Sequence, residues 1–430
     1  MRDYIIFAIV FGLLPFALFR PIIGVLLFTW ISLMNPHRLT YGAAYDFPFA
    51  AVIAVITLLG ILFSREPKRF PFTPVTIVLL IFMAWMTFTS FFALEPYLAW
   101  QEWNRVMKTL FFVLVSILLI NSEKDIKMFT WVIGLSLAFY GLKGGVFTLM
   151  SGGTSRVFGP AGSYIEDNNA LALALITVIP IIWFLKLQAK RKWLSHSLVI
   201  LTVLIGIAAA GSYSRGALLA GGAMLFFLWL KSQHKFRSGF ALLLVIPLLY
   251  TVMPEEWFNR MDTIDNYQED DSAMGRINAW QFGLNVAKDN LLGGGFIVFT
   301  PKMFLTYAPE PLDFHAAHSI YFQVLGEHGF IGLALFLLLL VMAWRTGTRI
   351  LKFSKTNPDL KWASDLAAMT QISIIGFAVG GAFLSMAYYD LYYDLLALLG
   401  LLEKTILHKP KQNMTPQLIQ PQTTAGLRQK

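Results

Sequence analysis

Two histidines and three arginines are the residues whose types and spacing could carry out chemistry. His315 and His318 occur in the stretch HAAHSIYF, where a spacing of three places both on one face at the start of a helix. Arg215 lies in GSYSRGALLA, with apolar sequence on both sides, while Arg156 and Arg276 lie in more polar stretches. A neutral imidazole can take a proton from a hydroxyl group, and arginine forms bidentate hydrogen bonds to phosphate. These residue types suit recognition of an anionic phosphate group beside a general base.

The same residues also have plain structural interpretations. Arg215 could extend its charge to a nearby membrane interface, and a histidine at a helix start usually makes an ordinary hydrogen bond. Arg276 is followed one turn later by Trp280, a pattern typical of an amphipathic helix at a membrane surface with a tryptophan anchor. Arg156 taken alone is a solvated loop charge. The chemical interpretation therefore depends on whether the elements bring these residues together.

A metal centre is the alternative use of the paired histidines. His315 and His318 could bind zinc, with Asp313 as a possible third ligand. The sequence contains no HExxH motif and no cysteine, which excludes thiolate zinc sites and cysteine nucleophiles. We therefore predict that no metal ion takes part.

The composition determines which elements can position these residues. Of the 430 residues, 57% are hydrophobic and only 14% are charged, against roughly a quarter charged in soluble domains. Apolar stretches long enough to cross the hydrocarbon recur throughout the chain. We predict an all-α, polytopic integral membrane protein with about 12 transmembrane helices; the first two spans and the last are short or interrupted. The predicted spans are about 4–19, 21–35, 47–63, 72–93, 104–121, 128–149, 168–185, 195–211, 213–230, 238–254, 318–344, 367–388 and 391–407.

The net charge of +9 is explained by topology. Lysine and arginine gather in alternate short loops, which by the positive-inside rule face the cytoplasm, so we predict no nucleic-acid partner. The other loops, which are poor in cations, would face outward. They lie at 36–46, 94–103, 150–167, 211–213 and 254–317. This topology places Arg156, Arg215, Arg276 and His318 together at the outward face.

Four regions follow from these spans. Residues 1–253 form an N-terminal bundle of about ten helices, and residues 254–317 form a long outward loop that carries an amphipathic helix. Residues 318–407 add the C-terminal transmembrane helices, with Asp390 and Asp394 near an outward turn, where an interfacial aromatic belt is expected. Residues 408–430, rich in Gln, Pro and Thr, are predicted to be a disordered cytoplasmic tail.

Four motifs in a fixed order resemble the O-antigen ligase and polymerase superfamily. They are SRVFGPAGSYIEDNNALA, GSYSRGALLA, GRINAWQFGLNVAKDNLLGGGF and HAAHSIYFQVLGEHGFIGL, and the resemblance covers roughly residues 150–345. The N-terminal third, with FRPIIGVLLFTWISLMNPHRLTYG, resembles the branch described as O-antigen ligases or O-glycosylation ligases. The resemblance implies a GT-C-like inverting glycosyltransferase of the bacterial inner membrane. It implies no metal or other cofactor, and an active site that faces the periplasm.

The resemblance also implies roles for individual residues. The essential histidine of the family falls on His318, and its SRG arginine and long-loop arginine fall on Arg215 and Arg276, which would bind a diphosphate. Arg156 matches a less strict arginine, and His315 is a possible neighbour that supports His318. The implied donor is a glycan on undecaprenyl diphosphate, held among membrane lipids, and the implied acceptor is a sugar hydroxyl of the lipid A core.

Three alternatives remain open from the sequence. An O-antigen polymerase and a protein O-oligosaccharyltransferase use the same lipid-linked donor with another acceptor, and the motifs do not separate them from a ligase. A secondary transporter would also have about 12 helices. Against a transporter, the interior of the helices lacks a chain of acidic residues at the midplane of the membrane, and the predicted ionisable cluster lies at one side.

Overall fold

The computed structural model describes residues 1–407 except 67, 69, 233, 245–246, 248–249, 252 and 263–270. Every regular element in these ranges is a helix, so the predicted all-α class is confirmed. The tail 408–430, predicted to be disordered, lies outside the described residues.

The helices of the first half follow the apolar stretches closely. Several begin at a side-chain cap: Thr73, Ser122 and Ser214 each accept a hydrogen bond from a backbone N–H of the first turn. The elements are α1 (Arg2–Phe19), α2 (Pro21–Met34), η1 (Pro36–Leu39), α3 (Phe49–Phe63), α4 (Pro74–Ser90), α5 (Pro96–Leu119), α6 (Glu123–Met150), α7 (Asn168–Gln188), α8 (Lys192–Ala210), α9 (Arg215–Lys231) and α10 (Lys235–Leu243).

The second half contains the helices of the long loop and the C-terminal helices. The elements are α12 (Glu255–Asp262), α13 (Asp271–Asp289), α14 (Pro301–Tyr307), α15 (Ile320–Ser354), η3 (Pro358–Leu360), α16 (Lys361–Gly381) and α17 (Asp390–Ile406). The predicted span 238–254 falls partly on residues outside the described ranges, and its first part ends with α10 at Leu243.

The apolar helices make this a multi-pass membrane protein. Within the described residues, six helices are long and apolar enough to cross a membrane, and three shorter apolar helices, α2, α3 and α4, accompany them. The six are α1, α6, α7, α8, α15 and the segment Pro358–Gly381, which contains α16. The number of twelve crossings stays a prediction.

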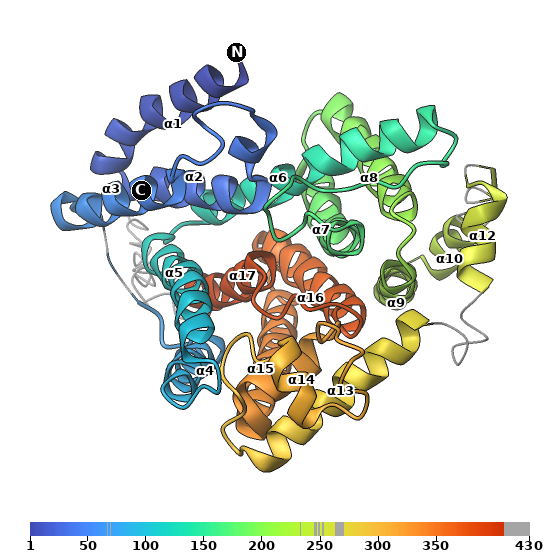
Figure 1. The fold of residues 1–430 in the computed structure, drawn as a ribbon. Coiled ribbons are helices and arrows are strands. Elements are labelled where there is room, and N and C mark those ends of the chain that lie inside the picture. Colours follow the sequence, from blue (N-terminus) through green and yellow to red (C-terminus); the bar gives the residue numbers. More distant parts are fainter. Residues whose placement is uncertain are drawn as a thin grey trace, which may run out of the picture.

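Helix α17 is the central element of the bundle. It lies in the middle of the molecule in Figure 1 and packs against α2, α4, α5, α6, α15 and α16. Asp390, Asp394, Tyr392 and Tyr393 on this helix are all buried. The expected aromatic belt at an interface is therefore wrong for this segment, because α17 is enclosed by other helices on every side.

Helix α15 is interrupted at Gly329, which has a φ of 67°. Just before the break, the carbonyl oxygens of Gly326 and Glu327 accept hydrogen bonds from the N–H groups of Gly294 and Gly295, each at 2.8 Å. The span predicted as one continuous helix is thus two helices. The break falls at Gly329 because only glycine adopts this positive φ without strain. The glycine loop that follows α13 occupies the space opened by the break.

Helix α13 packs one side against the rest of the molecule. Ala279, Phe282 and Val286 on this helix are buried against α14 and the loop that precedes it, and α13 lies beside α15. Its Trp280 stacks on Phe322 of α15 with the rings 5.1 Å apart. Trp280 thus joins α13 to α15, and its predicted role as a membrane anchor stays a prediction.

The loops predicted to face outward contact one another. The N–H of Leu94, after α4, donates to the carbonyl of Gly294 in the long loop at 2.8 Å. The N–H of Val157, after α6, donates to the carbonyl of Gly211, after α8, at 3.1 Å. Each of these bonds joins two loops that the sequence predicts on the same side of the membrane.

Candidate active site

One cavity brings three of the sequence-predicted residues together. It has a volume of about 180 Å³, and Arg215, Arg276 and His318 line it. These residues come from α9, from α13 and from the segment before α15, so only the tertiary structure places them side by side. The cavity is completed by Asn169, Tyr213, Ser214, Gly216, Phe383 and Leu384.

Two helices begin at this cavity. Arg215 is the first residue of α9, where the Ser214 hydroxyl caps the N–H of Ala217. Asn169 lies in the first turn of α7, which is capped by the Asp167 carboxylate. Helix N-termini carry partial positive charge and favour bound anions. The N-terminus of α9 and the arginine side chains thus provide the same sign of potential, while the Asp167 carboxylate at the start of α7 offsets part of it.

His318 lies in the segment before α15 and not on the helix, which begins at Ile320. The predicted placement of His315 and His318 on one helical face is therefore wrong. His318 has a φ of 43°, a left-handed conformation that costs a non-glycine residue about 1 to 3 kcal/mol. Its N–H donates to the Ser385 hydroxyl at 2.7 Å, across the gap between two chain segments.

Helix α13 fixes both Arg276 and the segment that carries His318. The indole N–H of Trp280 donates to the carbonyl of Ala317 at 2.9 Å, directly before His318. The Asn278 amide donates to the carbonyl of Asp313 at 2.8 Å. These bonds explain why the arginine of one loop helix and the histidine of a later segment share one cavity.

Arg156 and His315 lie next to the cavity instead of lining it. The guanidinium of Arg156 is 5.8 Å from the centre of the Tyr213 ring, which is itself part of the wall. His315 Nε2 is 2.8 Å from Asp313 Oδ1, and its ring packs where a side chain on Gly275 would lie. Among the described residues, no three histidine or acidic side chains gather as a metal-ligand set.

Two family models match the chain. Residues 1–190 match a family of unknown function (DUF5935), and residues 200–337 match the O-antigen ligase family. Residues 200–337, which are similar to this family, are called the O-antigen ligase domain below. A search of curated proteins gave no match. The match indicates an enzyme of the general ligase and polymerase type.

The O-antigen ligase domain contributes the three cationic or basic residues of the cavity, Arg215, Arg276 and His318. Asn169 comes from the region matched by the other family model, and Phe383 and Leu384 follow α16. The cavity therefore lies where the O-antigen ligase domain meets the rest of the bundle.

Burial and neighbouring positive charge keep the His318 imidazole neutral. Burial lowers the pKa of His318 below 6.5, and the positive charge of Arg276 and the neighbouring His315 lower it further. Asp167 acts in the opposite direction. His318 is therefore uncharged near pH 7, which is the state in which an imidazole can accept a proton.

Sequence reasoning missed the residues that support this site. Tyr213 has a φ of 62° and donates its hydroxyl hydrogen to the Gly153 carbonyl at 2.6 Å, joining two loops below Arg156. Its place in GSYSRG, two residues before Arg215, was the available signal. Ser385 left no such signal, because its partner His318 is 67 residues away in the chain.

Proposed function

We propose that this protein is an O-antigen ligase of the bacterial inner membrane. It transfers O-antigen polysaccharide from undecaprenyl diphosphate to a sugar hydroxyl of the lipid A core, as a metal-independent inverting glycosyltransferase with a GT-C-like architecture and a site that faces the periplasm. The observation that carries the proposal is the single cavity lined by Arg215, Arg276 and His318, all within the O-antigen ligase domain.

The arginines hold the leaving group in this proposal. Arg215 and Arg276 bind the diphosphate through bidentate hydrogen bonds, and the N-terminus of α9 adds backbone potential of the same sign. Negative charge develops on the diphosphate as its bond to the sugar breaks, so fixed cations stabilise the transition state more than the ground state. Arg156, above Tyr213, adds positive charge at the edge of the cavity.

His318 acts as the general base. Its neutral imidazole takes the proton of the acceptor hydroxyl while that oxygen attacks the anomeric carbon. The bond between the anomeric carbon and the phosphate oxygen breaks, and undecaprenyl diphosphate leaves with the bonding electrons. A single displacement from the opposite side inverts the anomeric centre. The prenyl chain lies in the lipid between helices, so the reaction takes place at the edge of the membrane.

A reconstituted transfer assay tests this proposal. Purified protein in chelator is given a polyprenyl diphosphate-linked glycan and either lipid A core or an acceptor protein. We expect transfer to lipid A core that survives chelation and is abolished in His318→Ala. Transfer only to protein identifies a protein O-oligosaccharyltransferase, and longer lipid-linked chains identify a polymerase. Full activity of His318→Ala would show that another group is the base.

A further inference from the structure

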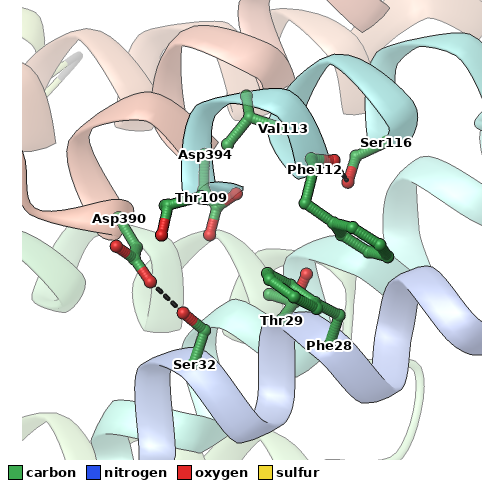
Figure 2. Close-up of a pocket in the computed structure, with 9 residues that line it drawn as sticks. All are labelled: Phe28, Thr29, Ser32, Thr109, Phe112, Val113, Ser116, Asp390 and Asp394. Carbon is green, nitrogen blue, oxygen red and sulfur yellow. Dashed lines mark hydrogen bonds between the residues drawn. The ribbon is translucent and has the colours of Figure 1, made fainter. Parts of the chain in front are cut away.

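A second polar cavity lies inside the bundle, away from the proposed active site. It has a volume of about 10 Å³, close to that of one water-sized sphere, between α2, α5 and α17 (Figure 2). Its polar wall consists of oxygen-bearing side chains only. They are Thr29 and Ser32 of α2, Thr109 and Ser116 of α5, and Asp390 and Asp394 of α17.

The two carboxylates in this cavity differ in their partners. Asp390 accepts a hydrogen bond from the Ser32 hydroxyl and is attracted by the guanidinium of Arg105 on α5. Asp394 is only 5% exposed, and Figure 2 shows its carboxylate beside the cavity without a hydrogen bond to the other residues drawn. Among the described residues, the charged group that acts on Asp394 is Asp390, which repels it.

An uncompensated carboxylate in a membrane-embedded bundle is strongly unfavourable. Asp394 therefore needs either a proton or a bound cation. The neighbouring hydroxyls and the second carboxylate are hard oxygen ligands, which suit alkali and alkaline-earth ions. Mg²⁺ usually keeps several waters, for which a cavity of about 10 Å³ has no room. Asp394 lacks one compensating positive charge, and the cavity has room for one small ion. A monovalent cation therefore fits this site best.

We propose that Asp394, with Asp390, Ser32 and Thr109, forms a buried sodium site that joins α2, α5 and α17. The bound ion compensates Asp394 and holds the start of α17 against two helices of the N-terminal part. Asp390 follows Ser385 by five residues, and Ser385 accepts the hydrogen bond from His318. The site thus stabilises the segment that supports the proposed base, although its existence does not depend on the proposed transfer reaction.

Sodium binding to the detergent-purified full chain tests this inference. We expect saturable binding of radioactive ²²Na⁺ and a saturable rise of the unfolding temperature in NaCl relative to choline chloride at equal ionic strength. Asp394→Asn, which keeps the shape and removes the charge, should weaken sodium binding at least about tenfold. Asp289→Asn, an exposed acidic position on α13, is the matched control and should bind as the wild type does.

Sodium titration of the wild-type protein tests the proposed site even if Asp394→Asn does not fold. Absence of saturable sodium binding between pH 6 and 8 overturns the proposal. An unfolding temperature that follows pH and ignores sodium also overturns it, and shows that a proton compensates Asp394. Equal sodium binding by Asp394→Asn and wild type places the ion elsewhere.

Discussion

His318 combines a strained backbone with a lowered pKa, and both follow from its surroundings. Its left-handed φ of 43° is held by the bond to Ser385, and its position among buried groups near Arg276 disfavours the protonated ring. Strain of this kind persists only where the surrounding structure fixes it, and it concentrates at functional sites. The residue is thus prepared in the orientation and the charge state that a general base requires.

The pH dependence of transfer tests this charge state. A base must be neutral, and a pKa below 6.5 keeps His318 neutral as the pH falls. We expect kcat/KM to be highest at neutral and mildly alkaline pH and to decrease in acid, with a midpoint below that of an ordinary histidine. Because Arg276 lowers the pKa of His318, Arg276→Gln should move the acidic decrease to higher pH. A wild-type midpoint above pH 6.5 would contradict the assignment.

The arginines of the cavity are tested by truncation. Arg215→Ala and Arg276→Ala should each reduce transfer about 100- to 1,000-fold, the usual loss for one charge-stabilising group, while the protein still inserts. Arg215→Lys should recover only part of this loss, because lysine lacks the bidentate geometry. Arg191→Ala, at an exposed arginine before α8, is the control and should be fully active. Near-normal turnover of Arg215→Ala would rule out its diphosphate role.

Among the elements, the segment between α16 and α17 positions the base. Ser385 in this segment is the hydrogen-bond acceptor for the His318 N–H. Ser385→Ala leaves that N–H without its partner, so we expect kcat to fall about tenfold with little change in KM. Ser385→Thr keeps the hydroxyl and should restore most of the rate. A parallel loss in both variants would indicate a packing defect instead of a positioning role.

The break in α15 is a second element-scale feature, and it depends on one residue. A Cβ on Gly329 would lie 2.2 Å from the Leu291 carbonyl oxygen, and the φ of 67° adds backbone strain. We expect Gly329→Ala to destabilise the protein by at least about 2 kcal/mol, measured by thermal unfolding in detergent. Gly222→Ala on α9, where a Cβ meets nothing within 4 Å, should be neutral or slightly stabilising. Similar unfolding temperatures for both variants would contradict the role of the break.

The sequence predicted the positions of most helices and the three residues that share the cavity. Apolar stretches of membrane length located most helices, although α5, α15 and α16 extend well beyond the predicted spans at one end. The alternation of charged loops placed Arg215, Arg276 and His318 at one end. What it could not predict depends on contacts between distant segments. The break at Gly329 needs the glycine loop at 293–295, and the conformation of His318 needs Ser385.

Buried acids are a feature at the scale of the whole molecule that sequence patterns did not single out. Glu327, Asp390, Asp394 and Glu403 are all buried in the bundle. Glu327 is held by the Tyr388 hydroxyl and the Ile297 N–H, and Glu403 pairs with Arg349. Asp394 alone has no such compensation among the described residues, which is why the proposed sodium site is placed there. Periodicity could not reveal the burial of the three acids on α17, because the helices that surround it are distant in sequence.

The orientation of the whole molecule in the membrane is open to a direct test. The chain contains no cysteine, so single cysteines can be labelled without background. Tyr41 and Leu312, in loops predicted to face outward, are 95% and 92% exposed, and Phe236, in a loop predicted to face the cytoplasm, is 96% exposed.

We expect Tyr41→Cys and Leu312→Cys to react with a membrane-impermeant maleimide in spheroplasts, and Phe236→Cys to react only after lysis. The positive-inside rule sets this orientation and places the loops that contain positions 41 and 312 on the same side. The opposite pattern would place the Arg215 and His318 cavity at the cytoplasmic side, where a periplasmic transfer reaction could not use it.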